Sequence, residues 1–218
     1  MEQDEQPKAL KKVAIIGAGP HSSVIAEILL QTKAYEIVGM IDGGSTEPVL
    51  GIPILGDDSI LPQLFESGVR YAFIAVGNNR LREKLALTAT GIGFELINAI
   101  SPHAHVSQYA QLGKGVAVMA GAIINPRAVL ADGVIVNTNA SVDHDCRVGS
   151  YAHIAPGCAV SGSTRIGDRS FLGTGSRVID RITIGKDVTI GAGATVIRDL
   201  PDKCTAVGVP AKIIKIKD

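Results

Sequence analysis

The 218-residue sequence predicts an α/β domain with a short parallel, Rossmann-like sheet, followed by a parallel β-helix. Two observations predict this order. Residues 12–99 alternate between apolar runs that suit buried strands and segments whose apolar residues have helical spacing, a pattern typical of a parallel sheet covered by helices. From Ile100 onwards an aliphatic residue recurs at every sixth position as far as Val196, and this fixed short period indicates a β-helix.

The α/β half is expected to contain four strands and three helices. The strand segments are 11–20, 35–42, 70–79 and 94–100, and the helical segments are 21–32, 58–68 and 80–91. The first residues of the chain are charged and lack an apolar run. We therefore expect a disordered tail over 1–11 and a nucleotide-sugar-binding domain over 12–99.

The repeat that follows keeps its register over seventeen hexads. Its aliphatic positions are Ile100, Val106, Leu112, Val118, Ile124, Leu130, Val136, Val142, Val148, Ile154, Val160, Ile166, Leu172, Val178, Ile184, Ile190 and Val196. Three hexads make one triangular coil, so each aliphatic side chain should point inward and stack on the one eighteen residues later. The residue four positions on is usually small, and Cys146 and Cys158 fall there as expected core residues. We expect the β-helix over 100–218, with the C-terminal segment closing its open end.

Composition argues against several classes of function. Lys plus Arg and Asp plus Glu both number 21, so no basic surplus favours nucleic acid or an anionic membrane as a partner. No apolar run approaches the roughly 18 residues needed to cross a bilayer. The three cysteines have neither disulfide-framework nor metal-ligand spacing. We therefore expect a cytoplasmic protein in a reducing compartment, with no metal.

Several motifs together resemble one enzyme family. They are GAGPH after the first strand, IDGG and VGNN at the ends of the second and third, VDHDC within the hexapeptide run, and GVPAKII near the C-terminus. In this combination the chain resembles the PglD/NeuD-type sugar acyltransferases over roughly residues 12–214. The resemblance implies a left-handed β-helix, a homotrimer, acetyl-CoA as donor and a nucleotide-linked amino sugar as acceptor. Segments such as GVAVMAG and FLGTGSRVI favour a GDP-perosamine-like acceptor, acetylated at the 4-amino group of a 4-amino-4,6-dideoxy sugar.

Association of several copies also has a basis in the residues themselves. Ile123, Val129 and Ile135 are the sixth residues of consecutive hexads, so they should lie on the three different faces of the prism. Symmetric copies of the chain can bury such flat apolar faces against one another. The pattern supports burial without fixing the number of subunits.

His144 is the candidate catalytic base. It is the third residue of its hexad, a position that is otherwise polar or small, so it should point outward. A neutral imidazole suits removal of the proton that an amine loses as it attacks a thioester. Spacing alone leaves catalysis and a surface role equally open, because the neighbouring Asp145 also occupies a corner position. The resemblance assigns the base to His144 and the supporting carboxylate to Asp145.

The resemblance also implies a donor site along the groove between neighbouring prisms. It places His153 near the thioester, although this residue lies half a coil from His144 and can approach that ring only across a subunit interface. Gly162 lies one coil above His144 and keeps the approach to it open. The other donor candidates are Gly173, Thr174 and Ala192 for the pantetheine, and Arg198 and Lys212 for the phosphates.

The acceptor candidates lie at the carboxyl ends of the expected α/β strands. They are Gly19, Pro20, His21, Asp42, Gly77 and Asn78. A glycine-containing loop before a helix is a ready anion site, but Ser22 stands where the dinucleotide fingerprint has its third glycine. Pro20 removes one backbone donor from this loop. Asp42 can accept from a base-edge N–H, which both guanine and uracil offer.

Three alternatives stay open at this point. An O-acetyltransferase of a sialic-acid-like sugar could use the same histidine. A zinc hydratase on a trimeric hexapeptide scaffold would need three imidazoles, of which only His144 and His153 are well placed. A binding scaffold without chemistry would release no thiol from acetyl-CoA.

Overall fold

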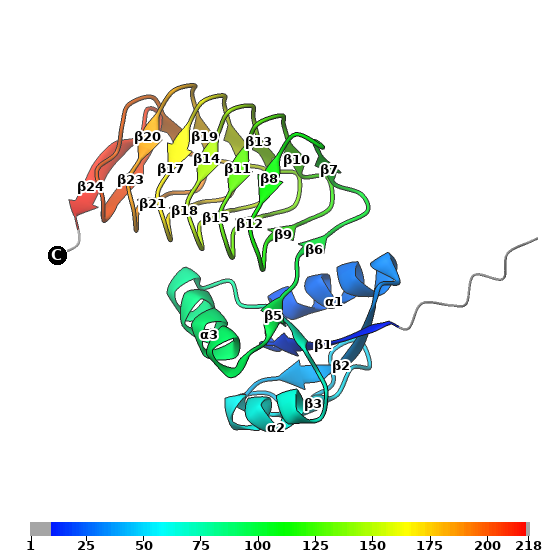
Figure 1. Cartoon of the computed structure of the whole chain (residues 1–218). Coiled ribbons are helices and arrows are strands. Elements are labelled where there is room, and N and C mark those ends of the chain that lie inside the picture. Colours follow the sequence, from blue (N-terminus) through cyan, green and yellow to red (C-terminus); the bar gives the residue numbers. More distant parts are fainter. Residues whose placement is uncertain (1–9, 217–218) are drawn as a thin grey trace, which may run out of the picture.

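The structure is a computed structural model that describes residues 10–216. An α/β domain lies along one side of a triangular prism of short strands (Figure 1). Most of the expected tail, residues 1–9, falls outside the described residues, and strand β1 begins at Lys11. The fold class predicted from the sequence is therefore confirmed: a parallel α/β sheet is followed by a left-handed β-helix.

The α/β sheet has five parallel strands in the order β3-β2-β1-β4-β5. The strands are β1 (Lys11–Ile16), β2 (Tyr35–Ile41), β3 (Ile54–Gly56), β4 (Tyr71–Ile74) and β5 (Glu95–Leu96). The chain builds outward from β1 to β3 and then returns to the other side of β1 with β4. This reversal opens a crevice at the carboxyl ends of β1 and β4, the usual position of a ligand in such sheets.

Helices cover both faces of this sheet. They are α1 (Pro20–Thr32), the short 3₁₀ segment η1 (Asp58–Ile60), α2 (Leu61–Glu66) and α3 (Asn79–Ile92). Ile25 and Leu29 of α1 pack in one cluster with sheet residues and with Ile135 of the β-helix, so α1 lies between the two parts of the molecule. Helices α2 and α3 cover the opposite face.

Seventeen two-residue strands form the prism, and each ends on a predicted aliphatic residue. They are β6 (Ala99–Ile100), β7 (His105–Val106), β8 (Gln111–Leu112), β9 (Ala117–Val118), β10 (Ile123–Ile124), β11 (Val129–Leu130), β12 (Ile135–Val136), β13 (Ser141–Val142), β14 (Arg147–Val148), β15 (His153–Ile154), β16 (Ala159–Val160), β17 (Arg165–Ile166), β18 (Phe171–Leu172), β19 (Arg177–Val178), β20 (Thr183–Ile184), β21 (Thr189–Ile190) and β22 (Thr195–Val196). Parallel partners are eighteen residues apart, as in the pairing of Ile124 with Val142. The predicted register is confirmed throughout.

The prism has three faces, which we name by the number of strands in each. The eight-stranded face runs from β6 to β24, the six-stranded face from β7 to β22, and the five-stranded face from β8 to β20. The chain ends with β23 (Cys204–Val207), parallel to β21, and β24 (Lys212–Ile216), antiparallel to β23. This short hairpin covers the last coil, as expected for the C-terminal segment.

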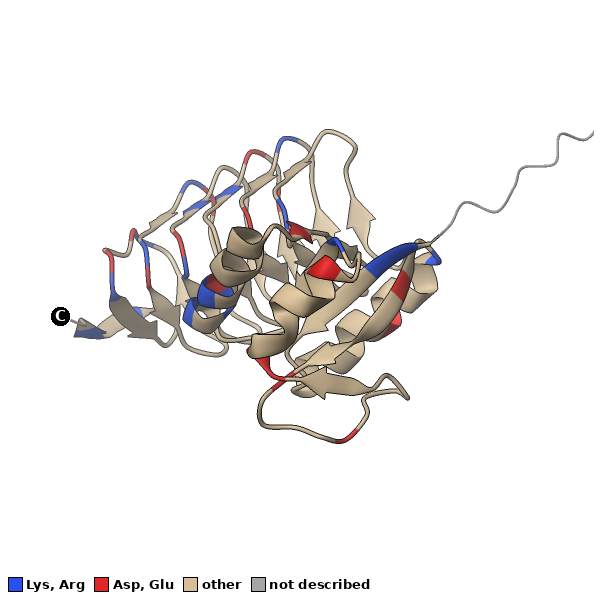
Figure 2. Ribbon diagram, turned by 60° about the horizontal axis from the view of Figure 1, so that its bottom comes forward, with Lys and Arg blue, Asp and Glu red and all other residues tan. Residues whose placement is uncertain are grey.

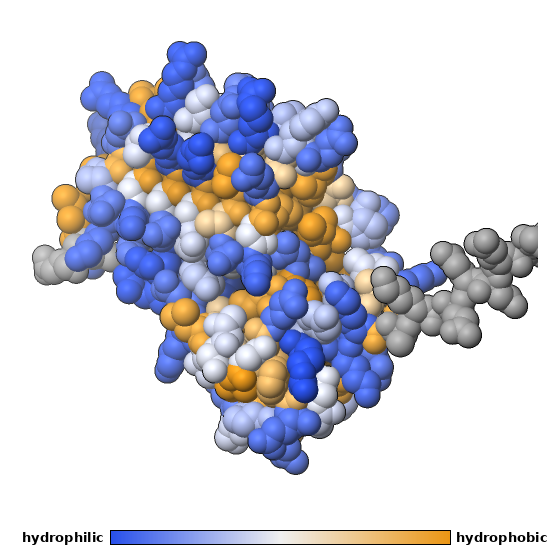
Figure 3. Space-filling view, viewed as in Figure 1, coloured by the Kyte–Doolittle hydropathy of each residue, from blue (hydrophilic) through white to orange (hydrophobic). Residues whose placement is uncertain are grey.

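The corners of the prism are built from left-handed backbone. The fourth residue of each hexad, from Gly115 to Gly193, has a φ between 54° and 71°. These residues include non-glycine residues such as Asp145, Tyr151 and Arg181. Charged residues gather at these corners and on the α/β surface (Figure 2), whereas the prism interior is aliphatic. Hydrophobic residues also run along the flank of the prism between hydrophilic rows (Figure 3).

The structure differs from the sequence-based expectations in three places. Strand β3 lies in a segment for which no element was predicted, and the expected strand over 94–100 divides into β5 of the α/β sheet and β6 of the prism. Ile135 is only 1% exposed because α1 of its own chain covers it, so it cannot contribute to a subunit interface. Ile123, by contrast, is 42% exposed on the six-stranded face.

The cysteines at the small repeat position lie inside the prism, as the repeat predicts. Cys146 and Cys158 are buried in the prism core, and Cys204, the first residue of β23, is buried against the same core. Burial raises the pKa of the Cys146 thiol to about 11. Within residues 10–216, the helices are too short or too polar to cross a lipid bilayer.

Candidate active site

His144 stands on the edge between the six-stranded and five-stranded faces, in a chain of three polar side chains. Its Nδ1 lies 2.8 Å from Oδ2 of Asp145. Arg127, one coil below, donates from Nε to Oδ1 of Asp145 at 2.6 Å and from Nη2 to Oδ2 at 2.8 Å. These contacts with Arg127 and then His144 hold the pKa of the Asp145 carboxyl well below its usual range.

The ionised carboxylate determines the state of the imidazole. Because Asp145 can only accept hydrogen bonds, it favours the tautomer of His144 that carries its proton on Nδ1. The Nε2 atom then has a lone pair that can accept a proton. The His144 side chain is 54% exposed, so a substrate can reach this atom from outside the chain.

Gly162 provides the space that the imidazole occupies. A Cβ atom at position 162 would lie 2.6 Å from Cε1 and 2.7 Å from Nε2 of His144. Any residue with a side chain would therefore displace the ring. The N–H of Gly162 makes no hydrogen bond within residues 10–216.

The other donor candidates fall on two edges of the prism. Arg198 is exposed on the same edge as His144 and Gly162. It lies three coils after His144 and two coils after Gly162. Thr174 and Ala192 are exposed on the edge between the eight-stranded and six-stranded faces, so both edges border the six-stranded face. Lys212 is exposed on β24. Gly173 is buried, and a Cβ there would lie 2.6 Å from the Ile190 carbonyl oxygen, so the packing of the next coil already requires glycine.

His153 lies at the seam between the prism and the α/β domain, away from His144. It is 9% exposed, its Nε2 is 3.1 Å from Nδ2 of Asn137, and its ring meets Phe171 edge-on at 5.3 Å between centroids. Burial, followed by the charge of Arg82, lowers its pKa to about 3. A positive charge on the nearby His21 would lower the pKa of His153 further. Burial and Arg82 lower the His21 pKa to about 4.

Asp42 organises the glycine loop at the carboxyl end of β1. Its Oδ2 accepts from the Ala18 N–H and its Oδ1 from the Gly44 N–H, both at 2.8 Å. These backbone donors, Ala18 first, lower the pKa of the carboxyl. Gly19 follows in the same loop with open space where a side chain would be, and Pro20 begins α1.

Three of the acceptor candidates, Asp42, Gly77 and Asn78, line two hollows at this end of the sheet. One, of about 330 Å³, is lined by Asp42, Thr46 and Asp57 among others. The second, of about 370 Å³, lies between the Gly77–Asn78 turn and the prism residues Arg169 and Phe171. The structure thus brings Gly19, Pro20, His21, Asp42, Gly77 and Asn78 to the carboxyl ends of β1, β2 and β4, as expected.

Three arginines of the site were missed by the sequence analysis. Arg127 could have been found, because it precedes Asp145 by one coil of eighteen residues at the same edge. Arg169 pairs with Glu83 and Asp187, and Arg82 bonds across the seam. The Arg169–Asp187 pair has the same eighteen-residue signal as Arg127–Asp145. The contact of Arg169 with Glu83 and those of Arg82 have no signal in the repeat, since they depend on how α3 docks. Within residues 10–216, no cluster of three or more His, Cys, Asp or Glu side chains is arranged to hold a metal ion.

Comparison with known proteins adds independent observations. The PglD N-terminal domain family matches residues 12–88, and the bacterial transferase hexapeptide family of six repeats matches residues 163–198. A mutant of perosamine N-acetyltransferase from Caulobacter crescentus, solved with CoA and GDP-perosamine, is 48% identical with a TM-score of 0.92 over 95% of this chain and 98% of that chain. The acetyltransferase domain of PglB from Neisseria gonorrhoeae, solved with acetyl coenzyme A, is 42% identical with a TM-score of 0.90 over 94% and 100%.

A curated relative points in the same direction. UDP-N-acetylbacillosamine N-acetyltransferase of Bacillus subtilis is 36% identical over 120 residues, which cover 51% of this chain. The match spans about half of that relative, 52% of its length.

Proposed function

Because the chain belongs to the PglD-type family of nucleotide-sugar N-acetyltransferases, we propose that it transfers the acetyl group of acetyl-CoA to the 4-amino group of a nucleotide-linked 4-amino-4,6-dideoxy sugar. The observation that carries this proposal is the His144–Asp145 pair, with a proton-accepting Nε2 on an exposed edge. GDP-perosamine is the favoured acceptor, since a protein 48% identical over 95% of this chain was solved with it.

The residues of this edge suit acetyl transfer in a simple sequence. The sugar amine attacks the thioester carbonyl carbon, and His144 Nε2 accepts the proton that the amine loses. Asp145, held by Arg127, stabilises the imidazolium that forms. The Gly162 N–H lies beside the ring and can donate to the oxygen on which negative charge develops. When the carbon–sulfur bond breaks, the imidazolium returns its proton to the thiolate of CoA.

The exterior of the prism fits a long, narrow donor. The small, exposed residues Thr174 and Ala192 leave the backbone accessible along one edge of the six-stranded face. On the other edge, Gly162 is buried beneath the His144 ring. In this proposal, Arg198 and Lys212 meet the phosphates of acetyl-CoA. His153 of a neighbouring copy contributes at its acyl end across the subunit interface, through the neutral imidazole that burial maintains.

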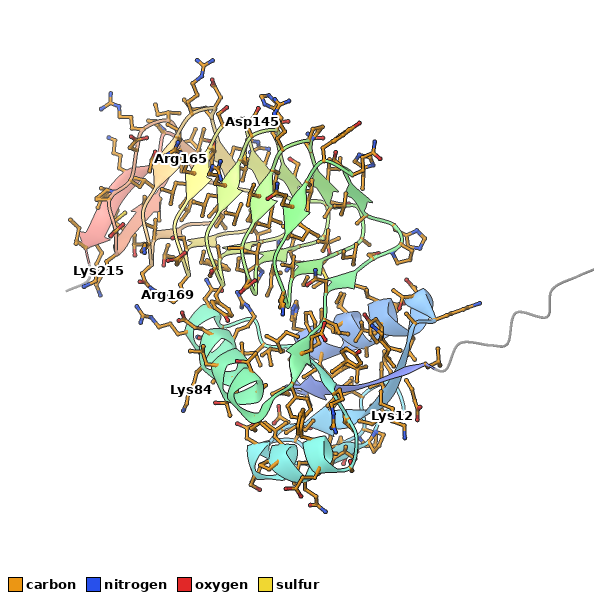
Figure 4. The ribbon with its side chains drawn as sticks, in the orientation of Figure 1. Lys12, Lys84, Asp145, Arg165, Arg169 and Lys215 are labelled. Carbon is orange, nitrogen blue, oxygen red and sulfur yellow. The ribbon has the colours of Figure 1, made fainter. Side chains whose placement is uncertain are left out.

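A second chain is needed to complete the proposed site. Asp145, the neighbour of His144, lies on the prism edge farthest from its own α/β domain (Figure 4). An acceptor held at Gly77 and Asn78 must therefore reach the His144 of another copy. A closed trimer places each α/β domain beside the prism of a neighbour, and we propose this assembly.

Thiol release from acetyl-CoA tests the function directly. The acceptors are GDP-, UDP- and dTDP-linked 4-amino-4,6-dideoxy sugars, with a sialic-acid-like sugar as the hydroxyl acceptor. We expect turnover with the GDP-linked amine, and a loss of ~10²–10⁴ in kcat for His144→Asn. The exposed His105→Asn is the matched control and should keep wild-type kcat. Absence of thiol release with every acceptor, or full activity of His144→Asn, would contradict the proposal.

A further inference from the structure

Arg82 of α3 has an unusual environment. Among residues 10–216 it is the one Lys, Arg, Asp or Glu in the buried class, with 1% exposure. Among the described residues no carboxylate accepts from its guanidinium; the acceptors are five backbone carbonyls and one side-chain amide oxygen. Burial lowers its pKa to about 10, so the group stays charged at neutral pH.

Half of these bonds go to the turn that precedes α3 and to the first residue of that helix. Nη1 donates to the carbonyl oxygens of Val76 and Gly77, each at 3.0 Å, and Nη2 donates to Oδ1 of Asn79 at 3.0 Å. The Gly77 carbonyl also faces His153, since it partly offsets the lowering of that imidazole's pKa. Arg82 therefore fixes the path of the turn that carries the acceptor candidates Gly77 and Asn78.

The other bonds go to two successive coils of the prism. Nε donates to the Gly133 carbonyl at 2.8 Å, and Nη2 donates to the Tyr151 carbonyl at 2.7 Å and the Ala152 carbonyl at 3.5 Å. Gly133 and Tyr151 are corner residues one coil apart. One planar guanidinium thus joins the acceptor turn to the chain segment that leads into His153.

The docking of the two domains does not depend on Arg82 alone. Arg169 pairs with Glu83 and with Asp187, and Arg80 pairs with Asp187. α1 adds the apolar contact with the eight-stranded face. Beside the turn, Asn79 Nδ2 also donates to the carbonyl oxygens of Arg169 and Ser170. These interactions hold the domains together, but none of them includes the Gly77 carbonyl, which Arg82 holds.

We propose that Arg82 is a positioning residue: it fixes the Gly77–Asn78 turn against the prism, so that the nucleotide sugar is presented to the transfer site in the correct register. This inference rests on the proposed function, because that function places a nucleotide sugar at the Gly77–Asn78 turn. A lysine cannot replace the fork, since one ammonium has three donors and cannot reach both coils and the turn together.

Steady-state kinetics of Arg82→Met and Arg82→Lys test the proposal, with GDP-perosamine and acetyl-CoA varied separately. We expect KM for GDP-perosamine to rise at least 10-fold in Arg82→Met and at least 3-fold in Arg82→Lys. KM for acetyl-CoA and kcat at saturating sugar should change less than about 3-fold, because none of the hydrogen-bond acceptors of Arg82 belongs to the chain of Arg127, Asp145 and His144. Lys84→Met, an exposed change on the same helix, is the matched control with wild-type constants.

A selective rise in KM for GDP-perosamine distinguishes a positioning role of Arg82 from a role in protein stability alone. Partial unfolding lowers the active fraction and hence kcat, and it leaves both KM values unchanged. If Arg82→Met does not assemble, Arg82→Lys carries the test. Wild-type KM for GDP-perosamine in the folded variants would overturn the inference. Absence of turnover in the wild-type protein with every acceptor would instead overturn the proposed function.

Discussion

His144 depends on residues one coil away on either side. Arg127 below anchors the carboxylate that orients the imidazole, and Gly162 above leaves the space in which the ring stands. The stacking period of eighteen residues brings these three positions together, although they are far apart in the sequence. At this scale the proposed chemistry follows from the repeat.

Gly162→Ala tests the steric part of this arrangement. The new Cβ would overlap the His144 ring, and the backbone φ at position 162 is not in the left-handed region, so the ring should yield rather than the coil. We expect a loss of about 10²-fold in kcat with a change in Tm of less than about 3 °C. Thiol-release kinetics and a thermal melt measure the two quantities.

A double mutant supplies the control for this prediction. In a His144→Ala background the clash disappears, so Gly162→Ala should cost less than about 3-fold further. An equal loss in both backgrounds would show that position 162 acts independently of the imidazole.

At the scale of the element, the backbone conformation at each prism corner determines which residue types are stable there. The left-handed backbone at Arg181, with φ of 59°, is disfavoured for a residue that has a Cβ. Its side chain is exposed, and its ion pair with Asp180 is 3.8 Å long. Glycine should suit this position better than arginine.

We therefore expect Arg181→Gly to stabilise the protein by about 1 kcal/mol per subunit. Denaturant midpoints measure the change. Arg177→Gly, in strand β19 and also exposed, is the matched control; it should destabilise, because glycine weakens a strand. A lower midpoint for Arg181→Gly than for the wild type would contradict this account of the corners.

The elements also show how far the sequence carries a prediction. The stacking of Val142 on Ile124 could be predicted, because burial in a narrow prism fixes one residue type at a fixed spacing. Strand β3 could not, since it has three residues and follows a turn-rich segment. The seam contacts of Arg82 and Arg169 could not be predicted either, because they depend on the relative placement of two domains.

For the whole molecule, the seam makes stability depend on pH. Burial depresses the pKa of His153 to about 3 and that of His21 to about 4, whereas the unfolded chain binds these protons near pH 6.5. Above pH 6.5 neither state binds them and the two histidines add no pH dependence. As the pH falls below 6.5 the unfolded chain gains protons first, so stability is lost progressively towards pH 4.

We expect each buried histidine to contribute a slope of up to about 1.4 kcal/mol per pH unit in this window. Unfolding in urea at pH 7, 6 and 5 measures it. His153→Asn should flatten the slope by one histidine's share, and His105→Asn, at an exposed site, should not alter it. Equal slopes for His153→Asn and the wild type would exclude the seam as the source.

The central claim is that His144 of one chain acts on a sugar held by the α/β domain of another, and mixed trimers measure this most directly. His144→Ala removes the base, and Gly19→Phe fills the open space of the glycine loop; each alone should retain no more than about a hundredth of the wild-type rate. In trimers mixed at random from equal amounts, about half of the sites have an intact His144 and about half have an intact glycine loop. About a quarter of the sites therefore have both. We therefore predict about a quarter of the wild-type rate of thiol release after the subunits are unfolded together and reassembled. A mixture no more active than the two separate variants would contradict the claim, because it would place both halves of the site in one chain.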